Sequence, residues 1–318
     1  MQTYIIRRLI QSFLVLILVT ILVFLIMRTL PGDPLIMYLS QDDMADFSTE
    51  ELDKLRHEWG MDRPMAVQYI DWVGGVLHGD LGTSMFTHVT VSSEIIRALP
   101  KTLYIGSLAF LLSIIVGVPA GVIAAIRRGG WLDTVVTMFA NLGITIPIFW
   151  MGILTIYLFG LYLGWLPIQG YTSPLDDFWL STRKIILPVF CLSIFAVAAS
   201  ARQTRSSMLE VIQQDYIRFA YSKGLPERVV IMRHALKNGL IPVITLKGMH
   251  VSMLFGGSVL IETVFNIPGM GRLAVDGVFS LDYAIVQGVI LIIAAVVTIS
   301  NLVVDISYGW FDPRVRYR

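Results

Sequence analysis

Residues 215–242 read DYIRFAYSKGLPERVVIMRHALKNGLIP and form a polar, basic segment between two runs that are apolar enough to cross a membrane. Its charged side chains are Arg218, Lys223, Arg228, Arg233 and Lys237 against Asp215 and Glu227. Loops with an excess of Lys and Arg stay on the cytoplasmic side of a membrane. The segment therefore predicts a charged cytoplasmic loop with helical character, clamped between two spans, that serves as a docking surface.

The composition of the chain agrees with a membrane protein. Its 318 residues are 55% hydrophobic and 15% charged, with a mean hydropathy of +0.71, whereas a soluble domain carries about 25% charged residues. Acids crowd residues 33–94 and bases crowd the other loops, a bias that indicates topology and not nucleic-acid binding. The single cysteine, Cys191, lies in an apolar run and excludes a disulfide framework. We expect it to be inert packing in an all-α polytopic protein.

Six stretches approach the roughly 20 apolar residues that a membrane span needs. They are residues 9–30, 102–126, 134–163, 185–201, 240–264 and 283–308. An even number of spans places both termini on one side, and the basic residues at 7–8, 127–128, 215–242 and 314–318 all fall on that side. Both termini are therefore predicted to be cytoplasmic. The first span ends in PGDP at residues 31–34 and not in a cleavage site, which favours an uncleaved anchor.

The spans divide the chain into three parts. Residues 1–30 are the N-terminus and first span, residues 31–101 form an outer-face region, and residues 102–318 form a core of five spans with a cytoplasmic loop at about 202–240. In the outer region, the STEE sequence at 48–51 predicts a capped short helix, and GDLGTS at 79–84 predicts a tight loop. We expect helices here to lie against the outer membrane face.

Two spans carry residues that interrupt helices. The GVPAG sequence at 117–121 and the Ile-Pro pair at 146–147 predict kinks inside the membrane. Packing of small residues against a partner helix is an equally good interpretation of the two glycines.

Ionisable residues also occur at membrane depth. Lys247 and His250 are three residues apart and share one helix face. A charge at the membrane centre costs about 2.5–3.5 kcal/mol, so each group needs a protein partner or water. One hypothesis places this pair on a translocation path, where it recognises a carboxylate; the other makes the two residues interhelical or interface contacts. Glu262 and Asp305 are expected near opposite membrane surfaces, within reach of water.

Several enzyme classes are excluded by missing motifs. The sequence has no G-x-x-x-x-G-K-[ST] phosphate loop and no HExxH zinc pair. Its Gly256-Gly257-Ser258 sequence is not the nucleophile elbow of a hydrolase. The chain is therefore not expected to be an enzyme, to hold a cofactor or metal, or to bind ATP itself, and energy must come from another subunit.

A resemblance to a known family rests on a series of short motifs. Ala220, Gly224 and the LIP sequence at 240–242 resemble the cytoplasmic EAA loop of ABC importer permeases. Further matches are LPGDP at 30–34, GDLG at 79–82, IPIFW at 146–150, GWLP at 164–167, RHAL at 233–236, ETVF at 262–265, PGMG at 268–271 and DPR at 312–314. Together they run nearly end to end and are similar to the dipeptide and oligopeptide permease family.

The chain also departs from the family pattern. Arg218-Phe219-Ala220 differs from the usual Glu-Ala-Ala, and Gly224 is farther from Pro242 than in the general pattern. Lys247 and His250 also look unusual for the family, which leaves the cargo open.

The resemblance implies a type I ABC importer permease fold with six transmembrane helices in a bacterial or archaeal inner membrane. A short helix around residues 216–224 would rest in a groove of an ATPase subunit, and ATP would be bound by that partner. The implied ATPase-coupling residues are Asp215, Tyr216, Arg218, Ala220, Gly224, Glu227, Arg228, Arg233, His234 and Pro242.

The implied partners are a second homologous permease, two ATPases, an extracytoplasmic binding protein that contacts residues 35–100, membrane lipid and a peptide substrate, with no nucleic acid. The alternative for residues 35–100 is a cap over the outer helix ends. The alternative cargoes are nickel complexes, glutathione and oligosaccharides. A self-contained secondary transporter or channel is a further alternative, against which the basic loop argues.

Overall fold

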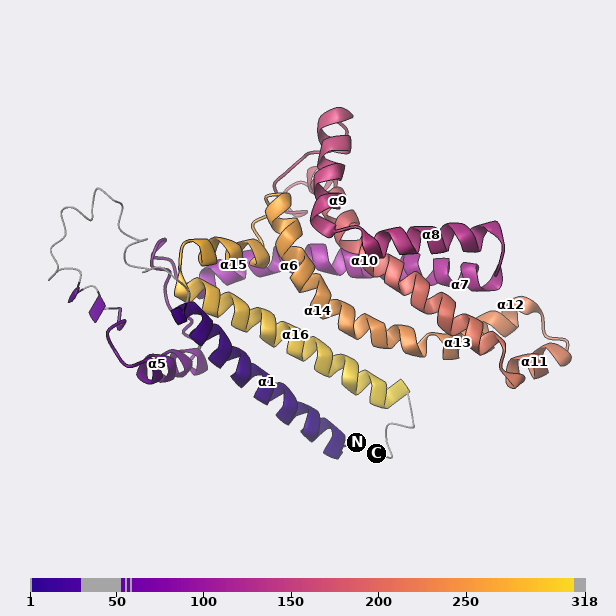
Figure 1. Cartoon of the computed structure of the whole chain (residues 1–318), viewed down its shortest axis with the longest axis horizontal. Coiled ribbons are helices and arrows are strands. Elements are labelled where there is room, and N and C mark those ends of the chain that lie inside the picture. The colour runs from indigo at the N-terminus through magenta and orange to yellow at the C-terminus, as the bar shows by residue number, and fades with distance from the viewer. Residues whose placement is uncertain (1, 30–52, 55, 58, 312–318) are drawn as a thin grey trace. The chain divides into compact units, whose positions relative to one another are not determined.

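The computed structural model describes residues 2–29, 53–54, 56–57 and 59–311, and these are mostly helical (Figure 1). Across these residues the only β-structure is an isolated bridge between Thr83 and Thr90. The predicted PGDP turn at 31–34, the capped helix at 48–51 and the basic end at 314–318 lie outside the described residues. The chain divides into two compact units, of which one comprises Thr102–Ile267 with the residues from Ser300, and the other Gln2–Lys101 with Pro268–Ile299.

The second of these, which we call the α1 unit, contains α1 (Gln2–Thr29), α5 (Met65–Leu77), the start of α6 (Val91–Leu112), α15 (Met270–Phe279) and most of α16 (Tyr283–Phe311). Helix α5 packs on the end of α1 through aromatic rings, with the Phe24 ring centroid 5.4 Å from Tyr69 and 6.3 Å from Trp72. The predicted tight loop at 79–84 is confirmed, since Asp80 Oδ1 accepts the Gly82 N–H at 2.8 Å and Ser84 Oγ donates to the buried Asp282 at 2.5 Å.

The other unit, the α10 unit, is built around the 35-residue helix α10 (Phe178–Ile212). Its other elements are the end of α6, the π-helix η1 (Ser113–Gly117), α7 (Val118–Ile126), α8 (Trp131–Thr145), α9 (Ile148–Thr155), η2 (Ile156–Tyr162), α11 (Asp215–Ser222), α12 (Glu227–Val229), η3 (Val230–Ala235), α13 (Leu236–Gly239) and α14 (Ile241–Val264). Helices α7, α8, α9 and α14 all pack against α10, and Figure 1 shows α7 and α8 running along it. Cys191 is fully buried in this core, as its apolar surroundings predict.

The predicted spans correspond to helices, with three differences. Among the described residues, four helices are long and apolar enough to cross a membrane, and two bent pairs bring the number up to six. The second span begins at Val91 and not at residue 102, because the helix continues through Pro100. Helix α10 extends to Ile212, so the first part of the predicted 202–240 loop continues a span. The third span is two helices, α8 and α9–η2, that meet at 103°.

The break in the third span follows from Pro147. This residue has extended backbone angles at the start of α9, and the residue before it, Ile146, is extended as well. Proline lacks an N–H and disfavours helix in the residue before it. The predicted kink at Ile146–Pro147 is therefore confirmed, as a full change of direction.

The GVPAG sequence at 117–121 packs closely against α10. A Cβ atom on Gly117 would lie 2.7 Å from the Val197 carbonyl oxygen, and one on Gly121 would lie 2.6 Å from Thr204 Cβ. The small-residue interpretation is therefore confirmed at both glycines, because only glycine lets the two helix backbones approach this closely. The helical irregularity is the π-turn η1, which ends at Gly117.

We predict that Gly121→Ala lowers the free energy of unfolding by about 1–3 kcal/mol, because the new methyl overlaps α10. Gly106→Ala in α6 is the matched control, since a Cβ atom there meets nothing within 4 Å; it should be neutral or slightly stabilising through helix propensity. Titration of the purified protein with SDS in mixed micelles measures both. Equal stability of the two variants would contradict the close approach.

Candidate functional site

Helix α11 has a buried face and an exposed aromatic face. Ile217 and Ala220, three residues apart, are buried in an apolar cluster with Met208 of α10 and with Val230, Ile231 and Ala235 of η3. Phe219 lies on the opposite face and is 61% exposed, and Tyr216 and Tyr221, which are 42% and 43% exposed, flank the buried face. Exposed aromatic side chains beside basic residues are typical of contact surfaces for other proteins.

The chain leaves α11 through a left-handed residue. Gly224 has a φ of +76°, and its N–H donates to the Tyr221 carbonyl at 2.9 Å. This conformation ends a helix at low cost only for glycine, so the predicted turn at Gly224 is confirmed. The returning segment is tied back by Asn238, whose Nδ2 donates to the Tyr216 hydroxyl at 2.8 Å.

The structure brings most of the predicted coupling residues onto this one exposed segment. Asp215, Arg218, Glu227, Arg228 and Arg233 are exposed, and His234 is half-buried. Arg218 lies 3.9 Å from Asp215, and both side chains are largely in solvent, so the pair contributes little to stability.

Two of the predicted coupling residues lie apart from this surface. Ala220 is buried against α10 and η3, so its part is packing, and Pro242 lies in the first turn of α14. A proline fits the first turn of a helix because that N–H has no partner within the helix.

Lys247 and His250 are buried on one face of α14, 8% and 2% exposed. Lys247 Nζ donates to Ser113 Oγ of η1 and to Ser200 Oγ of α10, both at 2.5 Å. Each serine hydroxyl donates to a carbonyl of its own helix, Ser113 to Phe110 at 2.6 Å and Ser200 to Ala196. The two oxygens are therefore fixed as acceptors for the ammonium group.

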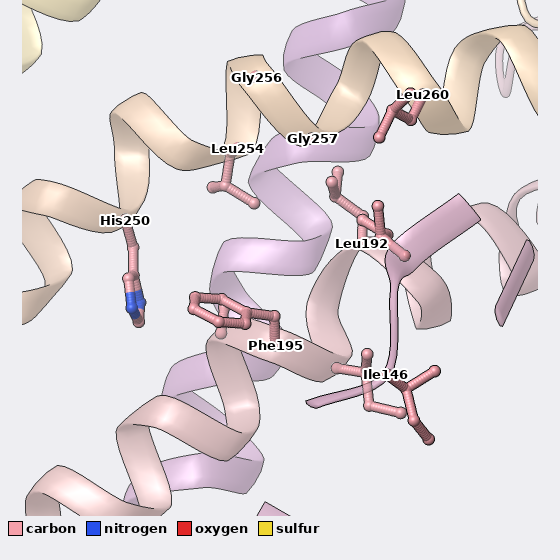
Figure 2. Close-up of a pocket in the computed structure, with 11 residues that line it drawn as sticks. Ile146, Leu192, Phe195, His250, Leu254, Gly256, Gly257 and Leu260 are labelled. Carbon is pink, nitrogen blue, oxygen red and sulfur yellow. The ribbon is translucent and has the colours of Figure 1, made fainter. Parts of the chain in front are cut away.

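A cavity of about 460 Å³ lies between α10, α14 and the start of α9 (Figure 2). Its walls are mostly apolar, with Leu192 and Phe195 from α10 and Leu254 and Leu260 from α14. Figure 2 shows the His250 ring beside Phe195, and the two ring centroids are 6.1 Å apart in an edge-on arrangement. His250 Nδ1 is buried and has no hydrogen-bond partner among the residues that the structure describes.

Glu262 differs from its predicted setting. It was expected within reach of water near a membrane surface, but it is 1% exposed and accepts a hydrogen bond from Thr102 Oγ1 at 2.6 Å. The expectation was wrong because α6 covers this end of α14, a contact that hydropathy does not reveal. The side chain of Asp305 lies outside the described part of the chain.

An ion pair that sequence reasoning missed links α8 to α10. Arg205 Nε and Nη2 donate to the two oxygens of Asp133 at 2.5 and 2.9 Å, and Asp133 Oδ2 also accepts the Gly129 N–H at 3.0 Å. Asp133 is buried and the Arg205 side chain is 30% exposed. The two residues are 72 positions apart in sequence, so the sequence does not pair them. The feature that could have pointed to this site is Asp133 itself, an acid in the first turn of an otherwise apolar helix.

Comparisons with known proteins agree with this architecture. Residues 117–317 match the model of the family described as binding-protein-dependent transport system inner membrane component, and residues 1–109 match that of its N-terminal part. A protein named as a peptide transport system permease of Brucella abortus (strain 2308) is 44% identical over 319 residues and covers all of both chains. The oligopeptide transport system permease protein AppB of Bacillus subtilis (strain 168) is 38% identical over 320 residues, again covering all of both chains.

The fold of the chain is similar to that of a solved membrane transporter. An inward-facing structure of the MetNI methionine ABC transporter superposes with a TM-score of 0.57 at 17% sequence identity, covering 69% of this chain and 96% of that chain. At this identity the match establishes a shared fold.

We predict that Arg205→Met lowers the free energy of unfolding by about 3 kcal/mol, because it leaves the buried Asp133 carboxylate without its cation. Adding Asp133→Asn should recover part of the loss and give a coupling of about 1–3 kcal/mol in a double-mutant cycle. The exposed pair Asp215–Arg218 is the control and should show no measurable coupling. Strictly additive effects at Asp133 and Arg205 would count against this pair as a link between α8 and α10.

Proposed function

Because this chain belongs to the family of binding-protein-dependent transport system inner membrane components, we propose that it is the permease subunit of an ABC importer that carries di- or oligopeptides. The observation that carries the proposal is the 44% identity, across the full length of both chains, with a peptide transport system permease. The chain is thus a multi-pass inner-membrane transport protein, and its cargo is assigned from the names of its relatives.

The proposed assembly contains a second homologous permease, two ATPase subunits and an extracytoplasmic binding protein. ATP binding and hydrolysis belong to the ATPases, and this chain supplies half of the path and no catalytic group. Both termini and the basic segment 215–242 lie in the cytoplasm in this proposal, supported by the excess of Lys and Arg. Family membership argues against a self-contained secondary transporter, and no observation favours nickel, glutathione or oligosaccharide cargo.

Helix α11 is the proposed contact with an ATPase. Its buried face holds it on α10 and η3, and its exposed face presents Phe219 with the Lys223 ammonium 4.6 Å above the ring. An amphipathic helix with aromatic anchors fits an apolar groove. Since only contacts that differ between two states shift a conformational equilibrium, a helix firmly attached to α10 can pass the movement of an ATPase to the spans.

We predict that Phe219→Ala weakens this contact and leaves the fold intact, because the ring is 61% exposed. Recovery of the ATPase subunits with the tagged permease in mild detergent, and peptide uptake, should both fall about tenfold, the effect of about 1.4 kcal/mol. Leu175→Ala, at a side chain that is 95% exposed outside α11, is the control and should change neither. Normal uptake and normal recovery for Phe219→Ala would remove α11 from the docking surface.

We further predict that Gly224→Val uncouples transport from ATP hydrolysis while the protein remains in the membrane. The φ of +76° is unfavourable for a β-branched residue, so the exit from α11 must change direction. Gly129→Val is the matched control, since Gly129 has a φ of +77° and, like Gly224, open space around its Cβ position. Peptide taken up per ATP hydrolysed, measured in proteoliposomes with the partner subunits, should fall about tenfold for Gly224→Val alone. Equal losses for both variants would indicate a general loss of stability.

A further inference from the structure

The Lys247 cluster, which comprises Lys247, Ser113 and Ser200, lies one helical turn from the cavity between α10 and α14. His250 and Ala196 line the cavity, and Lys247 and Ser200 lie one helical turn beyond them, on α14 and α10 respectively. The hydrogen bond from Lys247 to Ser200 joins the two helices in this next layer. A molecule in the cavity therefore meets mostly apolar walls, and its end reaches a cation where it extends past His250 into this next layer.

The ammonium of Lys247 faces neutral partners. Its ammonium contacts two neutral hydroxyls and lies 5.7 Å from the centre of the Phe110 ring. Among the side chains that the structure describes, no carboxylate lies within ion-pair distance of Nζ. A buried charge is costly unless an opposite charge compensates it, and hydroxyls and a ring supply only partial charge. Binding of a negatively charged group beside Lys247 would therefore be favourable.

The cavity itself fits a small apolar group with a polar end. Its volume of about 460 Å³ lies within the range of ligand sites, which are lined mostly by apolar side chains with a few polar groups. Leu192, Leu254 and Leu260 provide the apolar surface, and the lining residue His250 has a buried Nδ1 without a hydrogen-bond partner among the described residues. A peptide that ends in an apolar residue combines these features with a carboxylate.

We propose that this cavity binds the C-terminal residue of a transported peptide, with its apolar side chain between α10 and α14 and its carboxylate at Lys247. His250 Nδ1 then hydrogen-bonds the adjoining backbone of the peptide. The proposal rests on the peptide cargo proposed above and adds the end of the peptide that the permease recognises.

The test compares uptake of tritiated Ala-Ala-Leu with uptake of its C-terminal amide, in cells that carry the chain with its partner subunits. Lys247→Met and Lys247→Gln both remove the charge, and Gln keeps N–H donors for the two serines. We expect the ratio of acid to amide uptake to fall about tenfold in both variants, and to stay within about twofold of wild type in Lys247→Arg. The binding protein is the same in every strain, so its own preference cancels.

Lys184→Met is the control for loss of a positive charge elsewhere on α10, where Lys184 donates to Thr172 at 2.9 Å; its ratio should match wild type. An unchanged ratio in the two charge-removing variants, or an equal loss of both peptides, would overturn the proposal and leave Lys247 a packing role. Failure of the wild-type chain to take up either peptide would instead reject the peptide cargo, and this inference with it.

A second comparison tests the apolar part of the site. A Cβ atom on Gly257, which lines the cavity, would lie 3.2 Å from Leu192 and 3.6 Å from Ile148, whereas one on Gly106 in α6, outside the cavity lining, meets nothing within 4 Å. Gly257→Val should therefore narrow the cavity and reduce uptake of Ala-Ala-Phe relative to Ala-Ala-Ala several-fold, and Gly106→Val should not. Equal ratios in both variants would exclude this cavity as the site of the terminal side chain.

Discussion

The close approach to α10 of η1 at Gly117 and of α7 at Gly121 is the constraint on which the polar interior of the α10 unit depends. Within a membrane, apolar burial does little to hold helices together, so backbone contact and hydrogen bonds matter more. The contact at Gly117 involves Ser200 itself, and the π-turn that leads to Gly117 begins at Ser113. The two hydroxyls that hold Lys247 are thus positioned by the same glycine-lined interface.

Two buried charges of the α10 unit, those of Asp133 and Lys247, have different kinds of partner. Asp133 forms a bidentate ion pair with Arg205 and accepts a hydrogen bond from a backbone N–H as well. Such a site is complete and has no need of a further group. Within the described part of the chain, Lys247 donates to the oxygens of Ser113 and Ser200 and lies over the Phe110 ring, which solvate the ammonium without cancelling its charge. This contrast, more than burial alone, separates a structural ion pair from a site prepared for a ligand.

The sequence predicted those features that depend on local chemistry. Apolar runs located the helices, Pro147 located the break, and Gly224 located the end of α11. It did not predict the partners of Lys247, because Ser113 and Ser200 are 134 and 47 residues away in sequence and serines in apolar helices are unremarkable. It did not predict the burial of Glu262 or the pairing of Asp133 with Arg205 for the same reason, because both depend on the packing of neighbouring helices. The coupling roles of residues 215–242 remain predictions.

The length of α10 has a mechanical consequence. The helix contributes Ala196 to the cavity wall and ends at Ile212, and two residues then connect it to α11. From Ala196 to Ile212 the distance is roughly 24 Å at 1.5 Å per residue. A rod of this length turns a tilt of about ten degrees into a displacement of roughly 4 Å at its far end. A displacement of α11 thus corresponds to a smaller displacement of α10 at the cavity. A small change in the spacing of the cavity walls is sufficient to release a bound residue.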